Sequence, residues 1–160
     1  MLSQDDFKHL IKTAPLFAID IVVLNEQSQI LLGQRKNAPA QGFWFVPGGR
    51  VFKNESLEQA FERISAAELD LTISRHQATF LGLYDHFYPD SVFGEGISTH
   101  YINATHLIKL NTAQMQNLPT QQHQSYRWQK ISEIEQDDTV HQNSKVFLST
   151  LKETVKRLSA

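Results

Sequence analysis

One stretch constrains the fold of this chain more than any other: the segment Gly48 to Ser56 and the patterned helix that follows it. Two glycines follow Pro47, and we expect a tight turn there, in which backbone carbonyls can approach a ligand closely. Ser56 and Gln59 have the spacing of a helix N-cap and its capping-box partner, so the helix should run from Leu57 to about Leu71. Apolar residues recur along it at helical spacing and must face a sheet: Leu57, Ala60, Phe61, Ile64 and Leu71.

Glu68 falls on the same apolar stripe. A carboxylate in the last turn of a helix opposes the helix dipole, and burial adds a desolvation cost, so a buried Glu68 needs a cation or a cluster of donors. The alternative is that the helix frays at this point and Glu68 reaches water, as most glutamates do. The helix pattern alone leaves both interpretations open.

Length and composition indicate a single globular domain over residues 1–160. The chain is long enough for one full core, and its 41% hydrophobic and 20% charged residues are typical of soluble proteins. A formal net charge of -2 gives no basic surface for nucleic acid. Cysteine is absent, which excludes disulfides and cysteine nucleophiles and fits a cytoplasmic protein. The polar, acidic start and the lack of a long apolar run predict neither a signal peptide nor a membrane helix.

Hydrophobic periodicity and turn residues predict the remaining elements. A short helix after Ser3 should end before Pro15. Strands are expected at 16–24, 29–34, 43–46, 78–87, 99–110 and 126–129, further helices at 111–117 and 143–158, and loops at 35–42, 89–98 and 118–124. A mixed sheet with helices on both faces gives an α/β/α sandwich of the α+β kind.

The central stretch resembles the Nudix box, whose pattern is G-x5-E-x7-R-E-U-x-E-E-x-G-U with U a bulky apolar residue. The matching positions are Gly49, Glu55, Arg63, Glu68 and Leu71. Ile64 and Ala67 replace two glutamates of the pattern, and Asp70 replaces its glycine. In most of this family the missing carboxylates bind additional Mg²⁺ ions or act as the base, so their loss argues against the usual attack at phosphorus.

One branch of the family, GDP-mannose mannosyl hydrolase, lacks the same glutamates, and this chain is similar to it over nearly its whole length. The shared segments are Pro39 to Arg50, His86 to Tyr88, Thr99 to Tyr101, Gln122-His123 and Tyr126 to Trp128. The resemblance implies a Nudix-type fold and a homodimer. It also implies Mg²⁺-dependent hydrolysis of GDP-mannose, and of GDP-glucose, to GDP and free sugar, by water attack at the anomeric carbon with inversion.

The resemblance also supplies a metal site. It assigns three oxygen ligands for Mg²⁺: the carbonyl of Gly48, the carboxylate of Glu68 and the amide oxygen of Gln122. Hard oxygen ligands of this kind suit Mg²⁺. Taken alone, Gln122 would be interpreted as a solvated loop amide.

His123 is the candidate general base by the same resemblance. We expect it on a polar loop beside a metal ligand. Histidine can accept a proton from water near neutral pH, which Ile64 and Ala67 cannot do.

Three arginines flank the central turn and helix. Arg63 should mainly pair with Glu55 and so fix the loop. We also count Arg63 among the residues that bind the substrate. Arg35 and Arg50 are better placed for phosphate oxygens, which a planar guanidinium binds at two points. Tyr101 would add a hydroxyl donor to the leaving diphosphate.

The remaining candidates concern the sugar and the base. By resemblance, Asp20 and His86 contact the sugar, and Asp20 could stabilise positive charge that develops there. Without the resemblance, Asp20 would be an edge or pore-facing residue, and Tyr101 and His86 would be ordinary packing residues. The aromatic residues available for a nucleobase are Phe7, Phe43 and Trp44, and the resemblance favours Phe7, acting across a dimer.

Two other functions stay open on sequence grounds. The first keeps the fold but cuts the diphosphate at phosphorus, as a nucleoside-diphosphate-sugar diphosphatase. The second is a non-catalytic module that binds nucleotide sugars.

Overall fold

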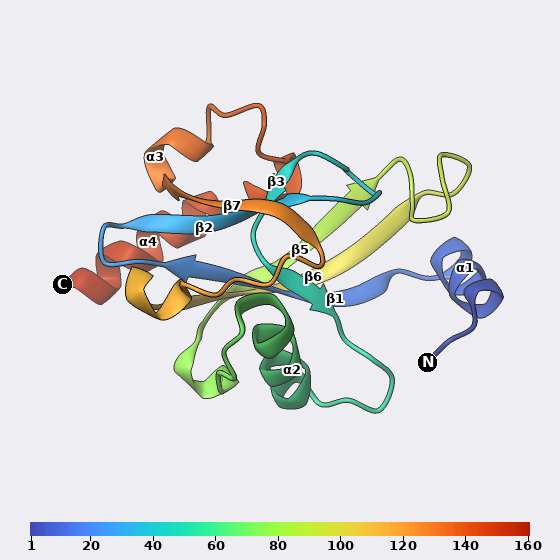
Figure 1. Cartoon of the computed structure of the whole chain (residues 1–160), viewed down its shortest axis with the longest axis horizontal. Helices are drawn as coiled ribbons and strands as arrows, with labels where there is room; N and C mark the ends of the chain where they lie inside the picture. Colours follow the sequence, from blue (N-terminus) through green and yellow to red (C-terminus); the bar gives the residue numbers. More distant parts are fainter.

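The computed structural model describes residues 1–160 and shows a seven-stranded mixed sheet with helices on both faces (Figure 1). The strands are β1 (Leu16–Leu24), β2 (Gln29–Arg35), β3 (Trp44–Phe45), β4 (Gly48–Arg50), β5 (Thr79–Tyr88), β6 (Thr99–Lys109) and β7 (His123–Lys130). The helices are α1 (Gln4–Thr13), α2 (Leu57–Leu69), α3 (Ile131–Ile134) and α4 (Leu148–Ser159). The predicted α/β/α arrangement is confirmed.

Strands β1 and β2 diverge, and the chain segment 44–50 fills the gap between them. They share a single Cα pair, Leu24 with Ile30. Beyond it, β3 pairs with β2, the chain reverses, and β4 pairs antiparallel with β1. On their outer edges, β1 pairs in parallel with β6, and β2 pairs antiparallel with β7. The gap between β1 and β2 therefore holds a short hairpin-like segment.

The two glycines of this segment correct one expectation. Gly48 and Gly49 do not form a tight turn, because they lie in strand β4, and the chain reverses just before them at Val46 and Pro47. A Cβ atom at Gly48 would collide with the side chain of Asp20 and the carbonyl of Ile19 on β1. Glycine is needed here for close approach of two backbones.

Two apolar cores lie on the two faces of the sheet. Strand β1 is buried along most of its length and serves both. Ile19, Ile21 and Val23 pack toward α2 in one core. Val22 and Leu24 pack in the other core with residues of α4 such as Leu151. Figure 1 shows α2 on one side of the sheet and α3 and α4 on the other.

Helix α2 begins where the sequence predicts and ends two residues earlier. Ser56 accepts a hydrogen bond from the Gln59 N–H at 3.2 Å, and the Gln59 side chain accepts one from the Ser56 N–H at 2.9 Å. The helix ends at Leu69 because Asp70 adopts a left-handed conformation with φ 56°. The Nudix pattern has glycine at this position, which is the residue that this conformation favours.

Other boundaries differ where tertiary pairing overrides local pattern. His123 and Gln124 belong to β7 and not to a loop, because β7 pairs with the full length of β2. The predicted helix at 111–117 is a 3₁₀ turn, Thr112–Met115, and the last helix begins at Leu148, after a 3₁₀ turn at Gln142–Ser144. Helix α3 and the 3₁₀ turn Arg75–Gln77 were not predicted. None of the helices has the length and apolarity needed to cross a membrane.

The capping box of α2 gives a test of the fold. Replacing the N-cap in Ser56→Ala removes the acceptor for the Gln59 N–H, and we expect the free energy of unfolding to fall by about 1 kcal/mol. Ser56→Asp retains an acceptor and should stay close to wild type. Urea unfolding of the three proteins measures the effect, and equal stability of all three would contradict the role of the cap.

Candidate active site

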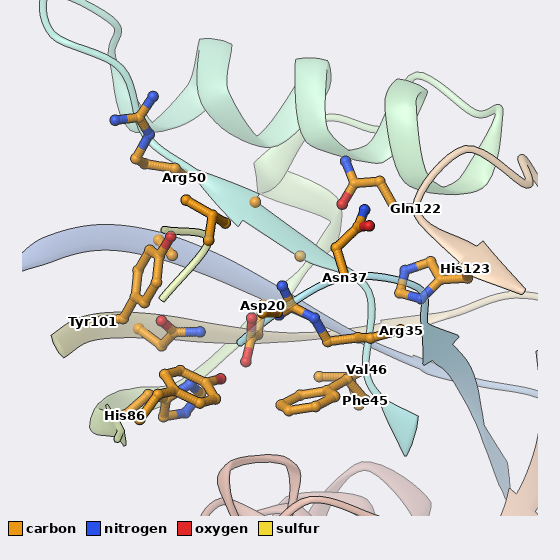
Figure 2. A pocket seen from close by; sticks show the side chains of 17 residues that line it. Asp20, Arg35, Asn37, Phe45, Val46, Arg50, His86, Tyr101, Gln122 and His123 are labelled. Atoms are coloured by element: carbon orange, nitrogen blue, oxygen red, sulfur yellow. The ribbon is translucent and has the colours of Figure 1, made fainter. Parts of the chain in front are cut away.

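A cavity of about 320 Å³ opens where β1, β4, β5 and β6 meet the ends of β2 and β7. Eight of the eleven predicted site residues line it (Figure 2): Asp20, Arg35, Gly48, Arg50, His86, Tyr101, Gln122 and His123. Glu68, Arg63 and Phe7 do not line it. The structure thus brings together residues that are widely separated in the sequence.

Strand register explains why these side chains converge. Asp20 on β1 lies between Gly48 of β4 and Thr105 of β6. Side chains two residues apart on a strand share a face, so Tyr101 points to the same face of β6 as residue 105. His86 of β5 is the Cα partner of Tyr101. One face of four neighbouring strands therefore supplies most of the cavity floor.

Asp20 lies at the bottom of the cavity and is 9% exposed. Burial raises its pKa to about 7, while Asn103, as a hydrogen-bond donor, and the charge of Arg35 lower the pKa and the charge of Glu68 raises it. A carboxyl group with a pKa near neutrality is therefore held against the backbone of β4.

Glu68 and His123 form a buried pair beside the cavity. Glu68 is 3% exposed, and its Oε2 lies 3.1 Å from Nε2 of His123. Of the two interpretations of Glu68, burial with a partner is therefore confirmed. The imidazole also packs tightly over β2, since a Cβ atom at Gly33 would lie 2.6 Å from its Cγ atom. Its Nδ1 atom has no hydrogen-bond partner.

Arg35 and Arg50 carry the positive charge of the cavity. Neither side chain forms an ion pair. The guanidinium of Arg35 lies 5.3 Å from the ring centroid of Phe45, and that of Arg50 lies 4.3 Å from the ring of Phe7 and 5.3 Å from that of Phe52. Aromatic faces hold both guanidiniums and leave their N–H groups open to an anion. Burial raises the pKa of the neighbouring Tyr101, which stays a neutral hydroxyl donor.

Arg63 lies outside the cavity and supports its wall. Its guanidinium donates to both carboxylate oxygens of Glu55, at 2.6 and 2.9 Å, and to the carbonyl of Arg50 at 2.7 Å. The Arg63 hydrogen bond holds the pKa of Glu55 below its usual range. The predicted pairing is confirmed, and through it Arg63 fixes the loop that carries Arg50.

Phe7 on α1 reaches the rim of the cavity but not its lining. Its ring contacts the guanidinium of Arg50 and packs edge-on against Phe93, with ring centroids 5.9 Å apart. Within one copy of the chain, Phe7 therefore packs against protein groups. A contact between Phe7 and a nucleobase remains a prediction.

The proposed metal ligands fit Mg²⁺ by their chemistry. Gly48 and Gln122 line the cavity, and Glu68 lies next to it through His123. No group of three or more His, Cys, Asp and Glu residues could hold a metal ion in this structure. A cation here would depend on carbonyl and amide oxygens beside one carboxylate, a set of hard ligands suited to Mg²⁺.

Sequence reasoning did not select several residues that line the cavity. They include Asn37, Phe45, Tyr88 and Asn103. Asn103 could have been found, because it follows Tyr101 by two residues in a predicted strand and so shares its face. Asn37 lies in a loop whose position depends on the rest of the fold, so no local pattern identifies it.

Comparisons with known proteins identify the family of the fold. The family model described as NUDIX domain matches residues 15–151. The low-salt glycan biosynthesis protein Agl8 of Haloferax volcanii is 43% identical over 104 residues, which cover 63% of this chain and 63% of that protein. The aligned region thus spans less than two thirds of the length of this curated relative.

Solved structures agree on the fold. A MutT NUDIX hydrolase from Burkholderia pseudomallei is similar with a TM-score of 0.67 and 24% identity, covering 85% of this chain and 97% of that chain. The NUDIX domain of Shewanella oneidensis NrtR, solved with ADP ribose, has a TM-score of 0.64 and 17% identity, covering 96% of this chain and 99% of that chain. At these identities the likeness concerns the fold alone.

The burial of His86 gives a prediction for pH dependence. Burial lowers its pKa from 6.5 to about 4, helped by His141 and opposed by Asp85. At a pH between these two pKa values, the unfolded chain binds a proton on His86 that the folded protein does not bind. The free energy of unfolding therefore falls as the pH falls. Relative to His86→Gln, we expect wild type to lose about 2 kcal/mol more of its free energy of unfolding between pH 7 and pH 5, measured with urea. An NMR titration of His86 with a midpoint near its ordinary pKa would contradict this.

Proposed function

This chain belongs to the NUDIX domain family, and on that premise we propose that it hydrolyses GDP-mannose to GDP and free mannose. GDP-glucose would be a second substrate, and the active form would be a homodimer of single-domain chains. The observation that carries the proposal is the lining of one cavity, which combines unpaired guanidiniums with buried polar groups. Arg35, Arg50 and Tyr101 suit a diphosphate, and the buried Asp20 and His86 beside them suit a neutral sugar.

The two replaced glutamates support cleavage at carbon over cleavage at phosphorus. Ile64 is 1% exposed and packs beneath Gly49, where an added Cβ atom would lie 3.0 Å from its Cγ1 atom. Ala67 is exposed and carries no ligand atom. Helix α2 therefore directs a single carboxylate, Glu68, toward the site, and lacks the further carboxylates that would hold more ions or activate water at phosphorus.

The residues present suit a single displacement at the anomeric carbon. A water oxygen would bond to C1 of the sugar while the bond from C1 to the phosphate oxygen breaks, and its electron pair leaves with GDP. His123 would accept the proton of water, and Arg35, Arg50 and Tyr101 would stabilise the charge on the departing diphosphate. A Mg²⁺ ion held by Gly48, Glu68 and Gln122 would supply further neutralisation of that charge. The ionised form of Asp20 would oppose positive charge that develops on the sugar.

The similarity to a protein named for glycan biosynthesis is consistent with a sugar-containing substrate. The NUDIX domain solved with ADP ribose is a further member of this fold whose ligand joins a diphosphate to a sugar. Neither comparison identifies mannose or guanine. These parts of the proposal rest on the resemblance of motifs and on the cavity.

The reaction in ¹⁸O-labelled water tests the site of attack. We expect the label in the released sugar and none in GDP, and we expect β-mannose first from α-linked GDP-mannose, because one displacement inverts the anomeric centre. Mass spectrometry of both products and NMR of the fresh sugar provide the measurements. Label in a phosphate product, or formation of GMP with mannose phosphate, would instead support the diphosphatase alternative, and no turnover with Mg²⁺ would support a binding module.

The role of His123 is tested by His123→Ala. If His123 takes the proton of water, kcat should fall by roughly 10²–10⁴-fold with a smaller change in KM. The change also removes the partner of Glu68, so the rate is measured over a range of Mg²⁺ concentrations. Gln124→Ala, at the exposed next position of β7, is the matched control and should keep wild-type rates. Full recovery of His123→Ala at high Mg²⁺ would show that His123 only positions Glu68.

A further inference from the structure

Asn103 on β6 carries a buried acceptor that the protein does not satisfy. The residue is 4% exposed and lines the cavity, and its Oδ1 atom has no hydrogen-bond partner. Natural proteins leave few buried polar atoms unpaired, and such atoms inside a binding cavity point to a group on the ligand. Asn103 is therefore a candidate for direct contact with a bound molecule.

The chemistry of the amide fixes what this atom can bind. Asn103 lies on β6, next to the strand that carries Asp20, and its amide lowers the pKa of that carboxyl group. An amide has its donors on nitrogen, and its carbonyl oxygen only accepts. The unpaired Oδ1 atom therefore needs a donor from a bound molecule.

A second unpaired atom lies on the adjacent strand. His86 is 2% exposed, lines the same cavity and has an Nε2 atom without a partner. Its Cα partner is Tyr101, two residues before Asn103 on the same face of β6. A neutral ring nitrogen and an amide oxygen therefore line the same cavity from neighbouring strands.

The amide oxygen of Asn103 selects for hydroxyl groups and against phosphate. An acceptor oxygen repels anionic oxygens, whereas a hydroxyl can donate a hydrogen bond to Oδ1 and can also pair with a neutral imidazole nitrogen in either of its tautomers. We propose that Asn103 is a specificity-determining residue whose Oδ1 atom accepts a hydrogen bond from one hydroxyl of the sugar, beside His86. This inference rests on the proposed function, in which the sugar lies beside Asp20 and His86.

The test compares Asn103→Leu, which has a similar volume and no polar atoms, with wild type. For GDP-mannose we expect kcat/KM to fall about 10- to 100-fold, while the affinity for GDP alone, measured by calorimetry, changes less than about twofold. A panel of singly deoxygenated GDP-mannose analogues then locates the contact. For one analogue the wild-type and Asn103→Leu rates should be nearly equal, because the hydroxyl that Asn103 binds is missing.

The panel also separates direct contact from positioning of Asp20. A loss transmitted through Asp20 affects every analogue equally and cancels when the analogues are compared. An equal loss with all analogues, an equal loss of GDP affinity, or unchanged kcat/KM for GDP-mannose would each overturn the proposal. If Asn103→Leu does not fold, Asn103→Val, which suits a strand, is used in its place.

Thr105→Val is the matched control. Thr105 is fully buried two residues further along the same face of β6, and its Oγ1 atom is also unpaired, but it does not line the cavity. Removing this hydroxyl should leave kcat/KM and the pattern across the analogues unchanged.

The proposed function and this inference can fail separately. If the wild-type protein releases no sugar from GDP-mannose, the proposed function fails. The inference is then tested by comparing the affinities of wild type and Asn103→Leu for GDP-mannose. Asn103→Leu should then weaken binding of GDP-mannose about 10- to 100-fold with little effect on GDP. Equal binding of GDP-mannose by both proteins would overturn the inference.

Discussion

The divergence of β1 from β2 is the constraint on which the site depends. Strand β1 is buried, so its backbone N–H and C=O groups must find partners where β2 has moved away. Segment 44–51 supplies them: the Ile21 N–H donates to the Pro47 carbonyl, and the Val51 N–H donates to the Phe17 carbonyl, both at 2.8 Å. This pairing places Gly48 against Asp20 and turns Arg50 toward the cavity. The backbone requirement of one strand thus assembles a carboxylate, a close carbonyl and a cation in one place.

Buried carboxyl groups and unpaired guanidiniums meet in and beside one cavity. Asp20 and Glu68 are both buried carboxyl groups, and the charge of Glu68 raises the pKa of Asp20. Glu68 gains a hydrogen-bond partner in His123, which offsets part of its desolvation cost. Arg35 and Arg50 are held by aromatic faces and keep their donors free. A ligand that brings negative charge to the arginines and hydroxyl groups to Asp20 complements both kinds of group at once.

Sequence reasoning succeeded where the physics is local. The start of α2 follows from the Ser56 cap, and the pairing of Arg63 with Glu55 follows from the family pattern, in which both positions are marked. The sequence-based predictions were wrong where pairing with a strand distant in the sequence determines the local backbone. Gly48 is extended because β1 approaches it, and His123 lies in a strand because β2 extends that far. The burial of Glu68 could be suspected from its helical stripe, but its partner lies 55 residues away in the sequence and no spacing rule identifies it.

The replacement of a box glutamate by Ile64 has consequences beyond the loss of a metal ligand. The side chain of Ile64 is buried where α2 packs on β4, next to Gly49. A carboxylate in that position would be buried without a partner unless a cation accompanied it, so an apolar side chain lets the helix pack on β4 without any ion. Helix α2 contributes Arg63, which fixes the loop of Arg50, and Glu68, which pairs with His123, while most groups that line the cavity come from the sheet. Because the sheet groups share one face of β1, β5 and β6, their spacing is fixed by strand register. Under the proposed function, such a surface suits recognition of a rigid sugar ring, whose hydroxyl groups are also held at fixed spacing.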